Sequence, residues 1–489
     1  MTHKFLLLRG FAVAAAVAAV VSCGRRYNPG AQVVDQWTVT DSAQTRTENT
    51  TEPEVRAGEK YIAEGDYTNF ILRGRALADS TAEAAILFHS DGEKGGYEVL
   101  IHNGAAIDGS LKTGSLLAVR NLYRSLAPNG RWFNFSVAVR GRNISVCIDS
   151  TEVVCYTEPK RPFRLPGFSG RRLSHGAIAF VGRKGSVRLR DVSIDVLSDN
   201  AANPSDSLPP IDEQSDGAIR LQQRFFPVID YHVHLKGGLT AAMAHAKEMN
   251  YGINYGVAIN VGEGGIGTML QNDQEAIDYC KRMRTAPFLM GGQGEGRRWI
   301  VRFTEPVLAK FDYIFTDALT LVDKGRICRI YRPEEVHLDG RTHEQYMDMI
   351  VDQTVKILTN EPVDFYANPT FLPDIMKADY DKLWTDARIN RVLDVLQRYG
   401  IALEINSRYK LPSFKIIRMA KARGIKFTFG TNNENADFGR SEYAIQAVEK
   451  CGLTPSDIWF PSMSRRAGRH AVDYNNFKDK AYAPIETLQ

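Results

Sequence analysis

The chain has few cysteines and almost no excess of charge of either sign. Six of its 489 residues are cysteine, and none shows the close pairing typical of a zinc site. The 61 basic and 57 acidic residues leave a net charge of only +4, and no basic stripe with interleaved aromatic residues occurs along the sequence. Proteins that bind nucleic acid usually carry such a stripe. We therefore expect no nucleic-acid partner.

Long apolar runs are missing beyond the first residues. The run Phe11–Val21 is too short to span a bilayer, and it leads into Ser22 and Cys23. This arrangement resembles the cleavage box of a bacterial lipoprotein, which implies that residues 1–22 are removed and that Cys23 becomes the lipidated N-terminus. We then expect a protein of the cell envelope, on the periplasmic face or the cell surface, held to the membrane by lipid alone. An ordinary secretory signal is the alternative.

Composition divides the rest of the chain. Residues 23–58 are rich in Thr, Ser, Glu and Gln and read as a tether, with at most an edge strand near Trp37. Residues 59–197 contain short strand-like runs separated by Asp-Gly, Gly-Gly and Asn-Gly turns, which predicts an all-β sandwich. Residues 198–219 are rich in Pro, Ser and Asp, as in a linker. Residues 461–489 read as a C-terminal tail.

Two cysteines of the predicted sandwich flank a predicted hairpin turn. Cys147 and Cys155 could face each other across that turn, so a disulfide between them is one option in an exported protein. The odd number of cysteines left after Cys23 does not decide the pairing.

Residues 220–460 alternate strand patterns with helix patterns. Thr385 can cap a helix in which Ile389, Val392 and Leu396 recur at helical spacing. Seven β-then-α units in series predict an α/β fold, either a parallel barrel or a doubly wound sheet. No Gly-rich phosphate loop follows the first strand, which weakens a dinucleotide-binding hypothesis. The predicted strands are 228–232, 255–260, 287–293, 311–315, 363–367, 402–406 and 426–430.

Polar residues collect where these strands end. Asp230, His232 and His234 alternate, so in an extended chain they point to one face. Two imidazoles and a carboxylate are suitable ligands for a divalent metal. In a parallel barrel the strand ends meet at the active site. Further candidates at these ends are Gln293, Glu295, Asp317, Asn368, Glu404, Asn406, Arg408 and Asn432.

Three of these motifs resemble the PHP (polymerase and histidinol phosphatase) family. They are Asp230–His234, Gln293–Glu295 and Ala402–Asn406. The resemblance implies a distorted seven-stranded β/α barrel that binds up to three divalent metals and hydrolyses phosphoesters. Several positions where that family has carboxylate or imidazole hold amides here, namely Asn260, Asn368 and Asn432. Because amides balance less positive charge, we expect at most one Zn²⁺ or Mn²⁺, with His232, His234 and Glu295 as ligands.

The predicted sandwich resembles the 3-keto-disaccharide hydrolase domain, a jelly roll related to concanavalin-like lectins. The resemblance covers about residues 60–197 and rests on Gly96–Glu98, Lys112–Gly114, Trp132–Asn134 and the Asn143–Val154 hairpin. It implies that a ketone at sugar C3 acidifies the neighbouring hydrogen, so that a base can open the glycosidic bond by elimination and hydration. Residues that would line the sugar cleft are Glu98, Arg120 and His175.

The leading hypothesis is therefore an exported lipoprotein hydrolase acting on glycosidic bonds of 3-keto disaccharides or related glycosides. Its catalytic candidates are Glu295, Asp317, Glu404 and Arg408, and Asn406 and Asn432 are candidates for binding the substrate in the barrel. One alternative is a carbohydrate-binding lipoprotein with a catalytically degenerate barrel. Another is a metal-dependent phosphoesterase of the PHP type.

Overall fold

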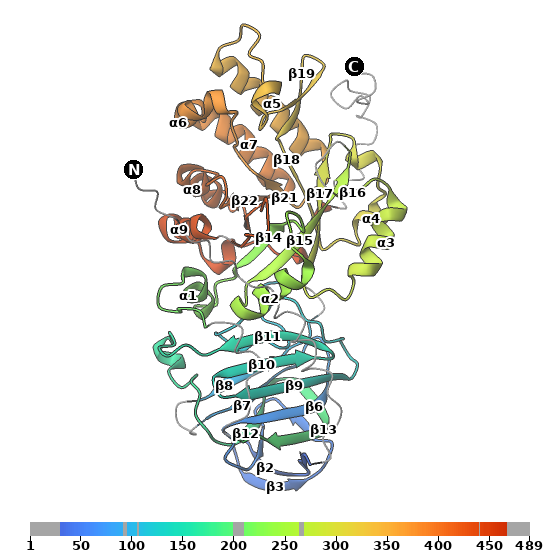
Figure 1. Ribbon diagram of the computed structural model, residues 1–489, viewed down its shortest axis with the longest axis vertical. Coiled ribbons are helices and arrows are strands. Elements are labelled where there is room, and N and C mark those ends of the chain that lie inside the picture. Colours follow the sequence, from blue (N-terminus) through green and yellow to red (C-terminus); the bar gives the residue numbers. More distant parts are fainter. Residues whose placement is uncertain are drawn as a thin grey trace, which may run out of the picture. The chain divides into compact units, whose positions relative to one another are not determined.

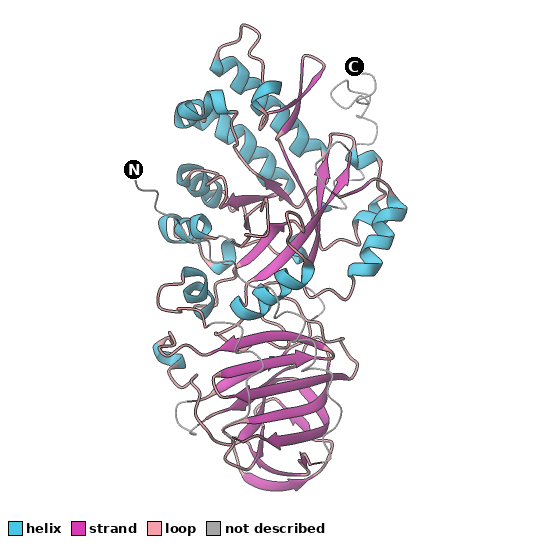
Figure 2. Cartoon of the chain, in the orientation of Figure 1, coloured by secondary structure: helices cyan, strands magenta, loops and turns pink. Residues whose placement is uncertain are grey.

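The computed structural model describes residues 30–90, 95–104, 107–198, 210–263, 268–439 and 441–466. These residues form two compact units, an antiparallel β-sandwich and a closed seven-stranded parallel α/β barrel (Figures 1 and 2). The predicted multidomain fold class is confirmed. The leader and Cys23 lie outside the described residues, so the lipid anchor stays a prediction. No helix within the described ranges has the length and apolar character needed to cross a membrane.

The sandwich consists of two antiparallel sheets that pack face to face. The larger sheet has the order β1 (Gln32–Val33), β13 (Ser186–Val196), β6 (Phe70–Ala78), β9 (Phe133–Arg140), β10 (Asn143–Ile148) and β11 (Thr151–Thr157), with β4 (Glu54–Arg56) also paired to β13. The smaller sheet has the order β3 (Thr45–Asn49), β2 (Gln36–Thr40), β5 (Lys60–Ala63), β12 (Ile178–Lys184), β7 (Glu83–Phe88) and β8 (Tyr97–Ile101). Alternate side chains of each strand enter a shared core in which aromatic rings meet edge to face, as Trp37 and Phe180 do at 5.9 Å.

The predicted tether is largely wrong. Strands β1 to β4 lie between residues 32 and 56, inside the segment 23–58 that was expected to be a tether. Trp37 is fully buried and its indole N–H donates to the carbonyl of Thr50 at 3.0 Å. The polar composition misleads because β3 lies at the edge of its sheet and alternates between exposed and half-buried side chains.

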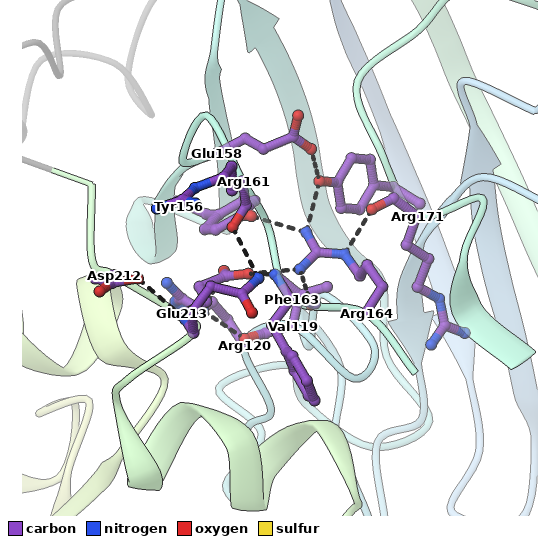
Figure 3. Close-up of polar contacts among 12 residues, drawn as sticks. Val119, Arg120, Tyr156, Glu158, Arg161, Phe163, Arg164, Arg171, Asp212 and Glu213 are labelled. Carbon is purple, nitrogen blue, oxygen red and sulfur yellow. Dashed lines mark hydrogen bonds and ion pairs between the residues drawn. The ribbon is translucent and has the colours of Figure 1, made fainter. Parts of the chain in front are cut away.

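The predicted linker and tail are also only partly right. Residues 199–209 and 467–489 lie outside the described residues. Within 198–219, however, Glu213 has no exposed surface and its carboxylate pairs with Arg164 of the sandwich at 2.7 Å (Figure 3). In the described part of the tail, Arg466 pairs with Asp364 of the barrel at 2.7 Å and is not freely solvated.

The disulfide between Cys147 and Cys155, which the sequence left as one option, is not formed. The register between β10 and β11 shifts at Val146 and Cys147, so that Cys155 lies opposite Ser145 and Cys147 lies opposite Glu152. Cys155 is a buried thiol that is not part of a disulfide. The bulge therefore separates two residues that a regular hairpin would have placed closer together.

The α/β unit is a parallel barrel and not a doubly wound sheet, which was the other architecture that the sequence allowed. Strand β14 pairs with both β15 and β23, all strand pairs are parallel, and the sheet closes on itself. Strand order around the barrel is β14 (Ile229–Val233), β15 (Asn254–Gly262), β17 (Leu289–Glu295), β18 (Tyr313–Asp317), β21 (Phe365–Ala367), β22 (Ala402–Asn406) and β23 (Phe427–Gly430). The short strand β16 (Met269–Leu270) extends β15. All seven predicted strands are present, with boundaries shifted by one or two residues at most ends.

Most helices connect these strands. They are α3 (Asp273–Met283), α4 (Glu305–Leu308), α5 (His343–Asn360), α6 (Tyr380–Leu383), α7 (Asp386–Tyr399) and α8 (Phe414–Ala422), whereas α1 (Gly217–Gln223) precedes β14 and α9 (Glu442–Cys451) follows β23. A hairpin, β19 (Thr320–Asp323) and β20 (Arg326–Arg329), follows β18. Helix α2 (Ala241–Tyr251) lies between β14 and β15 in sequence but packs on β11 and belongs to the sandwich unit. The predicted barrel domain 220–460 is therefore not one continuous stretch.

Aromatic rings fill the interior of the barrel beneath the strand ends. Phe315 and Phe365 stack with ring centroids 4.6 Å apart, and Tyr231 meets Tyr313 edge to face at 5.2 Å. Gly256 makes room for these rings, because a Cβ atom there would lie 2.1 Å from the Tyr313 hydroxyl. Packed aromatic rings thus fill the interior of the barrel, and its polar residues lie at the ends of the strands.

We predict that His89 makes the sandwich sensitive to acid. Its ring is buried, its Nε2–H donates to Thr68 O, and its Nδ1 accepts from the Ser174 N–H, which leaves no place for a second proton. Burial lowers the pKa of His89 to about 4, whereas the unfolded chain titrates near ~6.5. Stability should therefore be complete above pH ~6.5 and fall by about 3 kcal/mol as the pH drops towards 4.

The measurement is urea unfolding of the sandwich between pH 4 and 7. His89→Asn removes the titration and tolerates the positive φ of 54° at this position. His337→Asn is the matched control, because that imidazole is exposed and lies outside the sandwich. An unchanged pH slope in His89→Asn would contradict the prediction.

Candidate functional site

The carboxyl ends of the barrel strands bring most of the predicted barrel residues together. Each strand supplies its polar residues at the point where it ends, as the sequence predicted. They are His232 and His234 from β14, Gln293 and Glu295 from β17, Asp317 from β18, Asn368 after β21, Glu404 and Asn406 from β22, and Thr431 and Asn432 after β23. Most of these side chains are buried.

The contact between His232 and Glu404 is the centre of this cluster. The Nδ1 of His232 donates to Oε1 of Glu404 at 2.6 Å, and neither side chain has exposed surface. The other carboxylate oxygen accepts from the Asn368 backbone N–H at 2.6 Å and from the Asn406 amide at 3.0 Å. Gly430 leaves the space that this carboxylate occupies, because a Cβ atom there would lie 2.0 Å from Oε1. Glu404 is therefore held in one orientation and fixes the tautomer of His232.

Three asparagines form a network of hydrogen bonds between Glu404 and the carboxylate of Asp317. Asn368 donates to Asp317 at 3.1 Å and accepts from the amides of Asn406 and Asn432, both at 3.0 Å. Asn368 and Asn432 have positive φ values of 44° and 42°, a conformation that asparagine tolerates better than most residues. Asn406, a predicted substrate ligand, has no exposed surface, and its amide nitrogen is committed to this network.

Asp317 and Glu295 form a carboxylate pair at the ends of neighbouring strands. In the register of β17 and β18, Gly294 pairs with Thr316, so Glu295 and Asp317 follow side by side. Burial and then the charge of Asp317 raise the pKa of Glu295 to about 8. Burial also raises the pKa of Asp317, against the opposing charge of Arg297. The pair can hold and release a proton near neutral pH, as a general acid and base must.

Two cationic side chains lie at the rim of the cluster. Arg408 donates to the Asn432 carbonyl at 3.2 Å and forms an ion pair with Glu434. Sequence reasoning missed Lys236, whose pKa is lowered by burial and then by the neighbouring Arg408. Its place two residues after His234 was the available signal. A lysine with a lowered pKa beside a carboxylate pair can stabilise developing negative charge.

The three predicted metal ligands, His232, His234 and Glu295, do not come together as one site, although the two histidines lie side by side. The Nε2 of His232 is buried without a hydrogen-bond partner, and the Nδ1 of His234 contacts the Ala258 carbonyl at 3.1 Å. An imidazole held at Nδ1 in this way presents Nε2 to a metal, as His232 does, whereas the ring of His234 is also hydrogen-bonded to the Gln293 side chain. Burial lowers the pKa of His234 well below its usual range, which keeps the ring neutral. Among the residues that the structure describes, no three His, Cys, Asp or Glu side chains converge as a metal cage.

The three residues predicted to line a sugar cleft in the sandwich each have different partners. Glu98 pairs with Arg183 and lies 3.6 Å from Arg171. His175 is exposed and pairs with Asp66 at 2.6 Å. Arg120 is only 1% exposed and its Nε donates to the carbonyl of Asn250 at the end of α2, at 2.5 Å. Arg120 is thus a structural cap for a helix C-terminus.

Arg120 belongs to a buried polar cluster within the sandwich unit (Figure 3). Glu213 lies 2.7 Å from Arg164 and 3.6 Å from Arg120. Arg164 also donates to the hydroxyls of Tyr97 and Tyr156, at 2.9 and 2.8 Å. Buried charges of this kind are tolerated because each has a partner, and removing one partner costs roughly 3–5 kcal/mol.

Comparison with known proteins concerns the sandwich. Residues 26–195 match the model of the 3-keto-alpha-glucoside-1,2-lyase-like domain, a stretch that contains none of the barrel strands. A solved structure from Parabacteroides distasonis, assigned provisionally as a glycosyl hydrolase, is 14% identical over 33% of this chain and 88% of its own, with a TM-score of 0.28. The carbohydrate-binding module CBM66 from Bacillus subtilis is 12% identical over 33% of this chain and 92% of its own, with a TM-score of 0.21. Likeness at this level carries no functional information. No curated protein sequence matches the chain.

We predict that Gly430→Ala disrupts the contact between His232 and Glu404. The added Cβ would lie 2.0 Å from Glu404 Oε1 and 2.9 Å from His232 Cβ, where both side chains are buried. Overpacking of this kind should destabilise the barrel by about 1–3 kcal/mol in urea unfolding. Gly217→Ala in α1 is the control, since its nearest neighbour is a flexible Ile445 side chain at 3.1 Å. Equal stability of Gly430→Ala and the parent protein would refute the steric argument.

Proposed function

We propose that the chain is a hydrolase that processes glycosides, with its reacting bond held at the strand ends of the barrel. The family match over residues 26–195 supports a carbohydrate substrate. The observation that carries the proposal is the Glu295 and Asp317 pair beside the buried contact of His232 with Glu404. Carboxylates that share a proton near neutral pH are suited to glycosidic bond chemistry.

On this proposal the two carboxylates divide the proton transfers. Asp317 in its ionised form removes the acidified hydrogen beside the ketone of a 3-keto glycoside. Glu295, protonated at neutral pH because its pKa is raised to about 8, donates to the departing glycosidic oxygen. Lys236 and Arg408 at the rim then offset the negative charge that develops on the ketone oxygen. Water adds to the eliminated sugar in the final step.

His232 and His234 are the residues that would hold one divalent ion. A Zn²⁺ or Mn²⁺ ion would polarise a substrate oxygen or lower the pKa of a bound water. Glu404 orients His232 for this role through Nδ1. Glu295, the third ligand expected from the sequence, does not converge with them among the described residues, which leaves it free to act as the acid. Asn368 and Asn432 lack the charge that additional ions would require.

The proposed setting is the cell envelope, with the protein anchored by lipid at Cys23. The protein would therefore meet its saccharide substrate only after the protein itself has been exported. The second candidate function is a carbohydrate-binding lipoprotein whose barrel is not catalytic. The lack of three converging ionisable ligands in the described part of the chain favours it over a phosphoesterase of the PHP type. The hydrolase and the binding protein differ in one testable respect, because only the hydrolase requires catalysis by Glu295 and Asp317.

We predict that Glu295→Gln abolishes most of the activity on 3-keto disaccharides. Loss of a general acid should lower kcat by about 10²–10⁴-fold. In the parent protein the activity should fall as the pH rises through about 8, because Glu295 then loses its proton. The measurement is a pH profile of kcat/KM between pH 5 and 10.

The design includes two further variants. Asp317→Asn removes the charge that helps to raise the pKa of Glu295, so any residual activity should decline at a lower pH. Glu442→Gln, an exposed residue at the start of α9, should behave like the parent protein. Full activity of Glu295→Gln would rule out the proposed centre and favour the binding-protein alternative.

We predict at most one tightly bound metal ion per chain. Elemental analysis after incubation with Zn²⁺ or Mn²⁺ and gel filtration should give a ratio near one, reduced strongly in His232→Ala and His234→Ala. His245→Ala is the matched control, because that imidazole contacts the Glu152 carbonyl in the sandwich unit. Two or more ions per chain, or full metal content in both histidine variants, would contradict the assignment.

A further inference from the structure

The outer face of the larger sandwich sheet carries two arginines directly opposite each other. Arg75 on β6 and Arg190 on β13 are partners in the antiparallel register, so their side chains leave the same face side by side. The two strands neighbour each other in the sheet, with β9 on the other side of β6 (Figure 1). Like charges in this position destabilise a sheet.

The described residues around Arg75 and Arg190 do not fully neutralise the positive charge of the two side chains. Arg75 forms no ion pair with any of the described residues, and the nearest carboxylate to Arg190 is that of the exposed Asp191, at 3.9 Å. The Nε atoms of Arg75 and Arg190 are both buried without a hydrogen-bond partner. The next arginine along β6 shows the contrast, because Arg73 pairs with Asp195 at 2.9 Å.

An aromatic ring completes this surface. The guanidinium of Arg190 lies over the ring of Trp132 at 4.1 Å, and that of Arg188 lies 5.6 Å from the same ring. Arg188 is exposed, and Trp132 is half-buried at the start of β9. Stacking on the indole limits the freedom of the two guanidiniums. We call the residues Arg75, Arg188, Arg190 and Trp132 the arginine face.

We propose that the arginine face binds a saccharide chain that carries carboxylate groups. A guanidinium matches a carboxylate in a bidentate pair, and such a pair would supply the missing negative charge. Neighbouring strands place the Cα atoms of these arginines about 4.8 Å apart across the sheet and about 6.8 Å apart along it. This rigid, flat array suits an extended chain of repeating acidic units. Because the Trp132 ring is covered by arginines, it does not protrude as a side chain that inserts into a membrane would.

The inference concerns only the sandwich and goes beyond the proposed catalysis. It would hold whether or not the barrel hydrolyses anything, so the two proposals can fail separately. It also differs from the predicted cleft at Glu98, which lies on β8 of the other sheet.

The test is binding of the full-length protein to polygalacturonate, with uncharged dextran and anionic phospholipid vesicles as comparison probes. Polygalacturonate should bind, with an affinity that falls as salt increases, whereas dextran should not. Arg75→Gln combined with Arg190→Gln should weaken the binding by at least tenfold. Arg172→Gln, an exposed arginine outside the three strands, removes one charge elsewhere and should leave the affinity nearly unchanged.

A second readout separates binding from folding. Because Arg75 and Arg190 repel each other, Arg75→Gln alone should raise the Tm of the sandwich by about 1–2 °C while it weakens binding. A variant that lost affinity through misfolding would lose stability instead. The proposal is overturned if polygalacturonate does not bind, if the double variant binds it as well as the parent protein, or if only the vesicles bind.

Discussion

A single carboxylate that is shielded from water determines how the polar end of the barrel is arranged. Glu404 has no exposed surface, and both of its oxygens are committed, one to His232 and the other to Asn368 and Asn406. A buried charge without such partners would be costly, so the surrounding strands must end where they can supply donors. The closed sheet makes this feasible, because β14, β21 and β22 all end near the same point. The packed aromatic floor beneath excludes water and strengthens each of these contacts.

The sandwich depends on a similar arrangement around Glu213. This residue follows a segment with the composition of a linker, yet its carboxylate lies among two arginines and two tyrosines of the sandwich. Burial of several ionised groups rarely adds net stability compared with an apolar core. It does discriminate strongly between one arrangement of the chain and all others, because any displacement leaves a charge unpaired. The segment before α1 is thereby held in one position on the sandwich unit.

Much of the architecture could be predicted from local patterns. The seven barrel strands are continuous apolar runs and their ends carry His232, Glu295, Asp317 and Glu404, so both periodicity and placement were visible in the sequence. The roles of individual residues could not be predicted from such patterns. Arg120 resembled a sugar ligand but caps helix α2, because the partner that buries it is more than one hundred residues away. The same reason hides the arginine face: Arg75 and Arg190 are far apart in sequence and meet only through the register of β6 with β13. Composition alone could not distinguish a tether from edge strands.

The membership of helix α2 has a consequence for how this protein can have evolved. The helix is encoded between two barrel strands, but His245 and Asn250 of that helix contact residues of the sandwich unit. Neither unit is therefore complete within one uninterrupted segment of the gene. Recombination that exchanged one unit at the segment before α1 would deliver a sandwich without α2. An exchange that kept both units whole would have to carry the sequence of α2 along with the sandwich.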